Sequence, residues 1–319
     1  MTHPVVSFVM PVWNPRADWL IAAVRSVLAQ RGCQKELIVV DDGCPSPVEA
    51  LLQGIDDKRL RVLRVEHGGA SPARNAGVAA AVGDWFRFAD ADDVLELNST
   101  NRLLRLVNGA DDLIGYGATM WCDPDLRPLW TMASRVQGSA LTACVLRRFP
   151  VRPFSAVFPR SVVEATGDWD PELRLSHDWD YLLRALEHAT VRGETAIATY
   201  YRKHPSSLTN LAAAEEGRVV EKYFERHREQ RGTQLERRVQ ARLEATLARA
   251  YIAKGLAKDA FAAALRSLRL DPSALLEEGW QSSPRVVGRI RNTVRPREPV
   301  VAKPSSLGAS SARNGDDRA

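Results

Sequence analysis

Cysteine is scarce in this sequence, and the cysteines that occur are not arranged as a site. The chain has four, Cys33, Cys44, Cys122 and Cys144, which are widely spaced and form no Cys-x-x-Cys pair. This spacing argues against a zinc site and against a dithiol redox motif. We expect reduced structural thiols, as is usual in the cytosol.

Long apolar runs are also missing. No stretch approaches the roughly 18 consecutive apolar residues of a transmembrane helix, so none is predicted. The first residues, Met1 to Pro4, show no basic region leading into an apolar segment, which gives no indication of a signal peptide. We therefore expect a cytoplasmic protein.

The main part of the chain lacks an excess of either charge. Of 44 basic and 39 acidic residues, eight basic and three acidic ones lie from Gln281 onward, which leaves 36 of each sign in residues 1–280. The net charge of +5 therefore resides in the C-terminal segment. A folded nucleic-acid-binding face is not predicted.

What the sequence does contain is the composition of a globular protein, with 45% hydrophobic and 26% charged residues. Three short apolar runs predict strands, and periodic segments between them predict helices; the strands are Val5–Met10, Glu36–Val40 and Leu60–Val65. This alternation is typical of an α/β fold with a mostly parallel sheet and helices on both faces.

A helix rich in small residues is predicted after the third strand. Ser71 is the expected N-cap and Pro72 the first helical residue, while Ala73, Ala76 and Gly77 allow a close approach to the sheet. The helix should end at Gly83.

Three carboxylates follow the next strand, which is predicted over residues 84–89. Asp90, Asp92 and Asp93 lie at its C-terminal end, where open parallel sheets place ligands. Carboxylates this close repel one another unless a cation lies among them, and a divalent metal holding a phosphate is the usual solution. The alternative is a solvated acidic turn in which Asp93 caps the next helix.

The remaining sequence is less regular. A helix is predicted from residue 96 to Val107, a strand at 113–118, a helix capped by Ser176, and a last strand at 195–201. Residues 121–158 show no periodic signal and are interpreted as irregular. We expect a domain at residues 1–210 with halves 1–95 and 96–210, an α-helical hairpin-like appendage at 211–280, and a disordered basic tail at 281–319.

Five ordered blocks lie in the first 210 residues: Val-Ser-Phe-Val-Met-Pro-Val-Trp-Asn (6–14), Glu-Leu-Ile-Val-Val-Asp-Asp-Gly (36–43), Gly-Ala-Ser-Pro-Ala-Arg-Asn-Ala-Gly (69–77), Gly-Asp-Trp-Phe-Arg-Phe-Ala-Asp-Ala-Asp-Asp (83–93) and His-Asp-Trp-Asp (177–180). Together, in this order and spacing, they resemble family 2 glycosyltransferases, which have the Rossmann-like GT-A fold.

The resemblance implies a nucleotide-sugar site. The residues that it assigns to the nucleotide are Pro11, Val12, Asn14, Asp42, Arg74 and Asp90. A carboxylate such as Asp42 accepts hydrogen bonds from a base or a ribose hydroxyl, although alone it reads as a turn residue before Gly43. For Arg74, a phosphate contact and an ordinary surface arginine are equal alternatives.

The resemblance also implies a divalent cation, Mn²⁺ or Mg²⁺. Its expected ligands are Asp92 and Asp90, with His204 as a further candidate whose alternative is a solvated loop histidine. The metal would neutralise the departing diphosphate and would not generate a nucleophile.

Asp178 occupies the position of the family's catalytic base, which takes the proton of the acceptor hydroxyl in a single inverting displacement. Asp180 is a rival that points elsewhere on the helix. His177 stands where the family usually has Glu, so His177 and its neighbour Trp179 are the expected acceptor contacts. Trp121, Trp130 and Trp169 either stack on sugars or belong to the core.

The implied activity is transfer of a sugar from a nucleoside diphosphate, with UDP expected, to a glycan or lipid-linked acceptor during cell-surface polysaccharide synthesis. The basic tail fits weak peripheral attraction to an anionic membrane. Two alternatives are a nucleotidyltransferase, which would want a Gly-rich phosphate loop that Pro11–Asn14 does not supply, and a non-catalytic nucleotide-sugar-binding protein that works through its helices.

Overall fold

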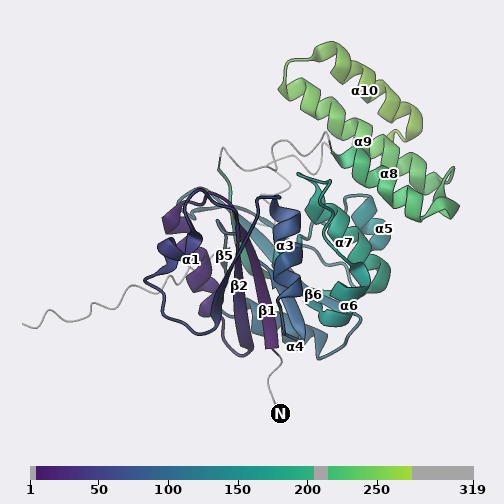
Figure 1. Ribbon diagram of the computed structural model, residues 1–319. Coiled ribbons are helices and arrows are strands. Elements are labelled where there is room, and N and C mark those ends of the chain that lie inside the picture. Colours follow the sequence, from purple (N-terminus) through teal and green to yellow (C-terminus); the bar gives the residue numbers. More distant parts are fainter. Residues whose placement is uncertain (1–4, 205–214, 275–319) are drawn as a thin grey trace, which may run out of the picture.

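A computed structural model of the chain describes residues 5–204 and 215–274 (Figure 1). The strands are β1 (Val5–Val12), β2 (Gln34–Asp42), β3 (Leu60–Val65), β4 (Trp85–Phe88), β5 (Val94–Leu95), β6 (Leu113–Cys122), β7 (Pro128–Met132), β8 (Ala156–Pro159) and β9 (Thr190–Arg202). The helices are α1 (Ala17–Leu28), α2 (Val48–Leu52), α3 (Ala70–Ala79), α4 (Ser99–Val107), α5 (Leu141–Val145), α6 (Arg160–Thr166), α7 (His177–His188), α8 (Glu216–Arg226), α9 (Gln234–Ala253) and α10 (Ala257–Leu270), with short 3-10 turns η1 (Pro153–Ser155) and η3 (Arg228–Gln230).

These strands form one mixed sheet in the order β3-β2-β1-β4-β8-β6-β9-β5, with β7 paired to β6. The first four are parallel neighbours, because each connection passes through a helix or loop that returns the chain to the same end. From β8 onward antiparallel pairs appear, although β6 and β9 run parallel. The predicted α/β fold with a mixed sheet is confirmed.

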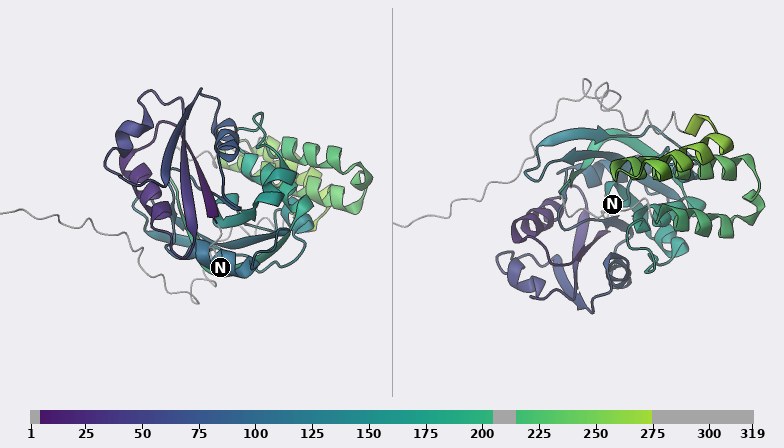
Figure 2. Two further views of the ribbon diagram at one scale, coloured as in Figure 1. Left: turned by 60° about the horizontal axis from the view of Figure 1, so that its bottom comes forward. Right: turned by 90° about the horizontal axis from the view of Figure 1, so that it is seen from above.

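The parallel half of the sheet is buried on both faces. Successive β1 side chains point to opposite sides, so Phe8 packs with α1, α2 and α4 while Val9 packs with α3 and the helices that follow β8. Figure 2 shows these two helical layers around the sheet. A strand buried on both faces is mostly apolar, and β1 is apolar except for the buried Ser7, whose hydroxyl donates to the Oε1 atom of Glu36 at 2.7 Å.

Gly77 explains how α3 lies so close to the sheet. A Cβ atom at this position would be 2.4 Å from the Cγ1 atom of Val9 and 3.1 Å from the Cγ2 atom of Val40. The prediction of a thin helix packed against the sheet is therefore confirmed. The predicted cap is wrong: Gly69 is the N-cap, with φ of 96°, and Ser71 lies inside the first turn.

The interpretation of residues 121–158 as irregular is also wrong. This segment contains the end of β6, the strands β7 and β8, and helix α5. Strand β8 has four residues, Ala-Val-Phe-Pro, and α5 has five, so neither is long enough to show a period. The strands among them belong to the second half of the sheet, and the same segment carries Arg152, a residue of the candidate site.

The C-terminal helices begin against the body of the molecule and then leave it. Buried residues of α8, among them Val219 and Phe224, pack into the same core as α7. Helices α9 and α10 form a hairpin that extends away from the sheet, with the turn at Gly255 (Figure 1). Both the predicted boundary at residues 210 and 211 and the predicted tail at 281–319 lie outside the described residues.

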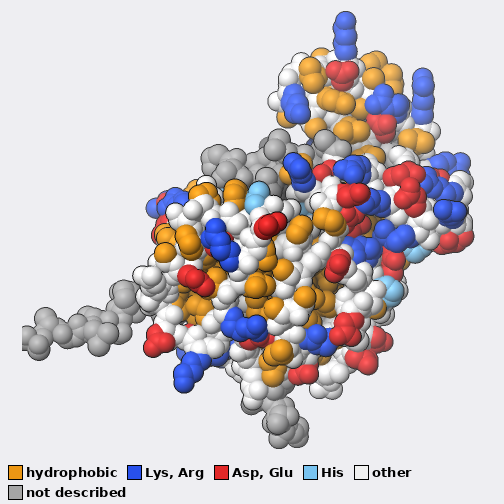
Figure 3. All heavy atoms as spheres, viewed as in Figure 1, with side chains coloured by type: hydrophobic (Ala, Val, Ile, Leu, Met, Phe, Trp, Pro, Cys, Tyr) orange, Lys and Arg blue, Asp and Glu red, His pale blue; other side chains and the backbone are white. Residues whose placement is uncertain are grey.

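Figure 3 shows hydrophobic side chains on the exposed surface of the hairpin. Within residues 5–204 and 215–274, six of the eight exposed large hydrophobic side chains lie on it: Ile252, Leu256, Phe261, Leu265, Leu268 and Leu270. Over the same residues, no helix has the length and apolar character needed to cross a bilayer.

Candidate active site

The predicted nucleotide residues gather at the C-terminal edge of the parallel strands. Strand β1 ends at Val12, β2 at Asp42 and β4 at Phe88, two residues before Asp90. Since β1 lies between β2 and β4, the three ends are adjacent. Sequence segments about 30 and 80 residues apart thus meet at one edge, as the fold class requires.

The turn after β1 is fixed by backbone contacts. Pro11 and Val12 are the last residues of β1 and pair with Val40 and Asp41 of β2. Asn14 has a positive φ of 42°, and its N–H donates to the Sγ atom of Cys44 at 3.3 Å. This turn leaves the indole of Trp13 48% exposed at the sheet edge.

Asp42 is engaged by its own protein neighbours. Its Oδ1 atom accepts from the N–H of Gly68 at 2.8 Å, and Oδ2 accepts from the N–H of Gly69 at 3.0 Å. Nδ1 of His67 lies 2.9 Å from Oδ2, and the His67 ring stacks on Trp13 with centroids 3.8 Å apart. Asp42 therefore shapes the loop before α3, and a direct nucleotide contact from its side chain stays a prediction.

Arg74 is not a surface arginine. Its side chain is 7% exposed, its Nη2 donates to the Oδ1 atom of Asp90 at 2.7 Å, and its guanidinium lies 4.6 Å from the ring centre of Trp169. Among the described residues, its Nε and Nη1 atoms are buried without a hydrogen-bond partner. Unpaired buried donors are costly, so this cation is suited to an anion that completes its hydrogen bonds.

Asp92 and Asp93 have different surroundings. The Oδ2 atom of Asp92 lies 2.8 Å from the Nε2 atom of His204, and the Asp92 side chain is 37% exposed. Asp93 is buried and accepts from the N–H of Arg202 at 2.8 Å, and the N-cap of α4 is Asn98, so the alternative in which Asp93 caps the next helix is wrong. Burial, together with the charges of Asp92 and Asp90, raises the pKa of Asp93 well above its ordinary value.

The residues present fit a divalent cation only if the substrate supplies further ligands. Asp92 and His204 offer one carboxylate and one imidazole, and Asp90 is tied to Arg74. Within residues 5–204 and 215–274, no group of three or more His, Cys, Asp or Glu side chains is placed to hold a metal ion. Mg²⁺ sites commonly use one or two carboxylates plus substrate phosphates, and this donor set agrees with that pattern.

Asp178 lies near the start of α7 and is paired with a cation that the sequence gave no reason to select. The Nη1 atom of Arg152 lies 2.5 Å from the Oδ2 atom of Asp178, and the N–H of Trp179 donates to Oδ1 at 2.9 Å. Burial alone raises the pKa of the Asp178 carboxyl, but the charges of Arg152, His177 and Arg147 and this N–H outweigh it and lower the pKa. The candidate base is therefore ionised.

Trp169 connects this carboxylate to the first group of residues. Its ring centre lies 4.6 Å from the Arg74 guanidinium, and its ring centroid lies 5.9 Å from that of His177, the neighbour of Asp178 in the sequence. Asp90, Arg74, His177, Arg152 and Asp178 therefore form one neighbourhood. Arg152 precedes the 3-10 turn η1 in a segment without periodicity, so only the fold could bring it to Asp178.

The two expected acceptor residues have different positions. His177 is almost buried against Trp169, with ring centroids 5.9 Å apart, and burial followed by the charge of Arg74 lowers its pKa. Trp179 lies in the core, where its Nε1 donates to the carbonyl of Cys144 at 3.1 Å, so this geometry does not support an acceptor contact. Trp169 is a core residue, stacked on Tyr181.

Asp180, the rival base, is buried and faces away. Its Oδ2 atom accepts from the Nε of Arg184 at 2.9 Å. The prediction that it points elsewhere on the helix is confirmed.

Glu215 holds the loop that presents Asp178. Its carboxylate accepts hydrogen bonds from the N–H groups of Arg174 at 3.1 Å, Leu175 at 2.7 Å and Ser176 at 3.1 Å. Ser176 is the N-cap of α7, as predicted, although its side chain makes no capping hydrogen bond. The segment before α8 therefore anchors the N-terminus of α7, which sequence reasoning missed.

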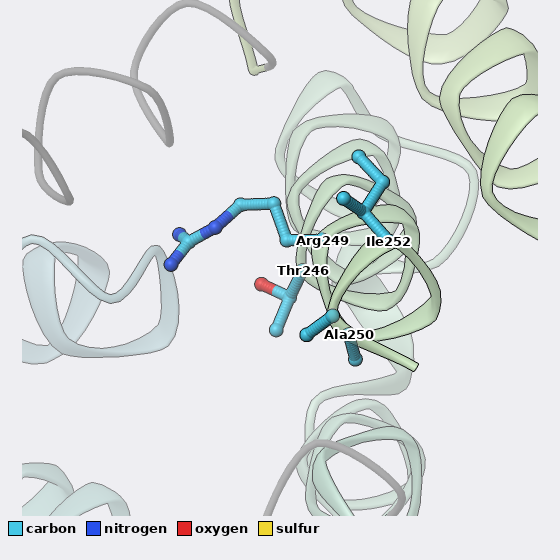
Figure 4. A pocket seen from close by; sticks show the side chains of 5 residues that line it. Thr246, Arg249, Ala250 and Ile252 are labelled. Atoms are coloured by element: carbon cyan, nitrogen blue, oxygen red, sulfur yellow. The ribbon is translucent and has the colours of Figure 1, made fainter. Parts of the chain in front are cut away.

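A shallow pocket of about 510 Å³ lies elsewhere, on the C-terminal hairpin. Its lining comes from the single helix α9, and Figure 4 shows Thr246, Arg249, Ala250 and Ile252 along one side of it. It gathers no carboxylates or histidines. The chemistry-bearing side chains lie at the sheet edge and not in this pocket.

The sequence of the chain is similar to known glycosyltransferases. Residues 7–162 match the sequence model described as "Glycosyl transferase family 2". The chain is 30% identical over 201 residues to "Succinoglycan biosynthesis protein ExoO" of Rhizobium meliloti, covering 57% of this chain and 56% of that protein. It is 27% identical over 223 residues to "Uncharacterized glycosyltransferase EpsJ" of Bacillus subtilis, covering 65% of this chain and 64% of that protein. The chain thus spans less than two thirds of these relatives' lengths.

Among solved structures, the fold resembles that of S. aureus TarS residues 1–349, determined in complex with UDP. The TM-score is 0.50 at 15% identity, and the similarity covers 88% of this chain and 92% of that one. At this identity the likeness concerns the fold alone. The GT-A-like fold expected from the sequence is confirmed.

Proposed function

The chain carries a glycosyl transferase family 2 domain, and from this premise we propose that the protein transfers a sugar from a nucleoside diphosphate to an acceptor hydroxyl with inversion. The single observation that carries the proposal is the chain of contacts that runs from the ion pair of Arg74 and Asp90 through Trp169 to His177, next to Asp178. A buried cation with unused donors lies on one side, and an ionised carboxylate lies on the other.

We assign the diphosphate to the side of Arg74 and Asp92. The unpaired Nε and Nη1 atoms of Arg74 are suited to phosphate oxygens. A divalent cation held by Asp92, with His204 and Asp90 nearby, would supply neutralisation of the charge that develops on the leaving diphosphate. The ends of β1 and β2, at Pro11, Val12, Asn14 and Asp42, border the nucleoside.

Asp178 acts as the base in this proposal. The acceptor oxygen bonds to the anomeric carbon while the bond from that carbon to the diphosphate oxygen breaks, and the diphosphate keeps the electron pair. The hydroxyl proton passes to Asp178, whose lowered pKa ensures that it is available as the carboxylate. His177 lies beside it and borders the same space.

We propose that the donor is a UDP-sugar, that the acceptor belongs to polysaccharide synthesis, and that the enzyme works in the cytoplasm. The succinoglycan biosynthesis relative and the UDP complex of the structural neighbour support this choice. The alternative of a non-catalytic binding protein is disfavoured because it gives no role to the Asp178 carboxylate, which is paired with Arg152 and follows His177.

A thermal-shift panel tests the donor assignment. UDP, GDP, CDP and dTDP are each added with Mn²⁺ or with EDTA to the wild type, to Asp92→Ala and to the control Asp125→Ala, whose side chain is 68% exposed in the β6–β7 turn. We expect one nucleotide, UDP, to raise Tm only with Mn²⁺, in the wild type and the control but not in Asp92→Ala. The absence of any nucleotide-dependent shift would contradict the proposal.

A further inference from the structure

A cluster of aromatic and cationic side chains contacts Asp178 through Arg152. We call it the aromatic–cation cluster; its members are Trp121, Trp130, Arg152, Tyr201 and Lys203. They come from β6, β7, the residue before η1, the end of β9 and the residue that follows it. The edge of the second half of the sheet thus brings them together.

Arg152 is the centre of this cluster. Its Cζ atom lies 5.6 Å from the ring centre of Trp121 and 5.9 Å from that of Tyr201, within cation–π range. Its Nη1 lies 2.5 Å from Asp178, and the Arg152 side chain is 24% exposed. A guanidinium has five N–H donors in a planar fork, so one bond to Asp178 leaves capacity for a second anion.

The outer part of the cluster is an aromatic face with a second cation. Trp130 is half-buried and stacks on Trp121, with centroids 5.2 Å apart and an interplanar angle of 16°. The Nζ atom of Lys203, an exposed residue, lies 5.3 Å from the ring centre of Trp130. Flat aromatic faces suit the apolar face of a sugar ring, and the cations at either end suit its charged substituent.

We propose that the aromatic–cation cluster binds a negatively charged sugar of the acceptor, carrying a carboxylate or a phosphate. Arg152 holds the anionic group, the half-buried indole of Trp130 contacts the ring, and Lys203 adds long-range attraction. A neutral sugar would leave the guanidinium paired with Asp178 alone. Arg152 is thus a specificity-determining residue.

This inference rests on the proposed function, and it links acceptor choice to the chemistry. When one guanidinium contacts both the acceptor anion and Asp178, the acceptor hydroxyls are brought next to the base. The second negative charge also weakens the pull of Arg152 on Asp178, so the base accepts a proton more readily. A charged acceptor therefore improves both binding and proton transfer.

Binding of simple glycosides to the full chain tests this inference without donor or metal. The probes are methyl β-D-glucoside, methyl β-D-glucuronide and methyl glucoside 6-phosphate, measured by saturation-transfer NMR and titration at tens of millimolar concentration. The variants are Arg152→Gln, Lys203→Gln, Trp130→Ala and the control Arg127→Gln, which removes an exposed charge from the β6–β7 turn. Circular dichroism checks that each variant is folded.

We expect the wild type and Arg127→Gln to bind at least one anionic glycoside about tenfold more tightly than the neutral one. Arg152→Gln should remove this preference, Lys203→Gln should reduce it, and Trp130→Ala should weaken all three probes alike. Whichever anion is preferred identifies the substituent. If Arg152→Gln does not fold, the reduction in Lys203→Gln carries the test.

Equal binding of all probes, no detectable binding of the anionic ones, or a preference that survives in Arg152→Gln or is unchanged in Lys203→Gln would overturn the inference. These results are independent of the nucleotide panel. A protein that binds UDP but shows no anion preference would keep the proposed function and contradict the acceptor inference. A protein that prefers anionic glycosides but binds no nucleotide would contradict the proposed function instead.

Discussion

The ion pair between Asp178 and Arg152 is the feature on which the chemistry of the site depends. Sequence reasoning identified Asp178 through its family block, but not the cation that keeps it ionised, because Arg152 lies in a segment without periodicity or motif. For Arg74 the sequence left a phosphate contact and an ordinary surface arginine as equal alternatives, whereas the structure buries this side chain against Asp90 and Trp169. Burial and pairing are properties of the fold, so these roles could not be read from residue types.

Replacement of the base should remove activity and preserve the fold. Asp178→Asn keeps a hydrogen-bond acceptor for Arg152 but cannot take a proton, so we expect UDP release from a UDP-sugar to fall about 10²- to 10⁴-fold. Metal-dependent UDP binding should be retained, as checked by thermal shift. A variant with near wild-type turnover would exclude Asp178 as the base.

The pH dependence of turnover should report the same pair. Burial raises the pKa of Asp178, and Arg152→Gln removes the largest of the influences that oppose burial, so the pKa of this carboxyl should rise. The carboxylate would protonate at a higher pH, and we expect the acid limb of the pH profile to move up by about one unit. Identical acid limbs in the wild type and Arg152→Gln would argue against this coupling.

At the scale of elements, the sequence was informative where patterns are long and uninformative where elements are short. The strands β1 to β3 and helix α7 follow from apolar runs and a periodic stripe, and β3 is found at its predicted residues. Strands β7 and β8 and helix α5 each have four or five residues and depend on pairing within the sheet. Their absence from the prediction is why the acceptor side was not anticipated.

The close packing of α3 gives a stability prediction. Gly77→Ala gains helix propensity but places a Cβ 2.4 Å from Val9, so we expect a net loss of about 1–3 kcal/mol in the free energy of unfolding. The matched control is Gly217→Ala in α8, where the new Cβ meets Leu243 at an ordinary 3.6 Å; there we expect a gain of about 0.5–1 kcal/mol. Denaturant titration measures the free energy of unfolding of both variants. Equal changes in the two would contradict the close packing of α3 as the cause.

Glu215 should link the C-terminal helices to the presentation of the base. Glu215→Gln weakens three hydrogen bonds to the loop before α7, and we expect a loss of about 1–3 kcal/mol of stability together with reduced turnover. The exposed Glu225→Gln in α8 is the control and should leave both unchanged. UDP binding should persist, because the donor residues lie on other elements; a parallel loss of UDP binding would point to global unfolding.

The same carboxylate contributes a pH-dependent term. Burial alone raises the pKa of Glu215, but its N–H donors outweigh burial and lower it in the folded state. Its stabilising contribution is therefore present above the unfolded pKa of about 4.3 and is lost as the pH falls through the lower folded value. Denaturant titrations at several pH values should therefore show that the difference in the free energy of unfolding between wild type and Glu215→Gln shrinks as the pH falls below about 4.3.

At the scale of the whole molecule, the residues of the candidate site come from both halves of the mixed sheet. The parallel half supplies the edge at which Arg74, Asp90 and Asp92 lie, and the half that begins with β8 supplies Arg152 and the aromatic–cation cluster. Asp178 lies between them at the start of α7. The order of motifs along the chain predicted the first half and the base, while the second half required the fold.

The measurement that tests this account most directly is release of UDP from a panel of UDP-sugars by the wild type, with Mn²⁺ and with EDTA, beside Asp92→Ala and Asp178→Asn. We predict slow release with one sugar that requires Mn²⁺ and is lost in both variants. Release that is equal with EDTA, or that persists in Asp178→Asn at the wild-type rate, would contradict a metal-assisted transferase that uses Asp178 as its base.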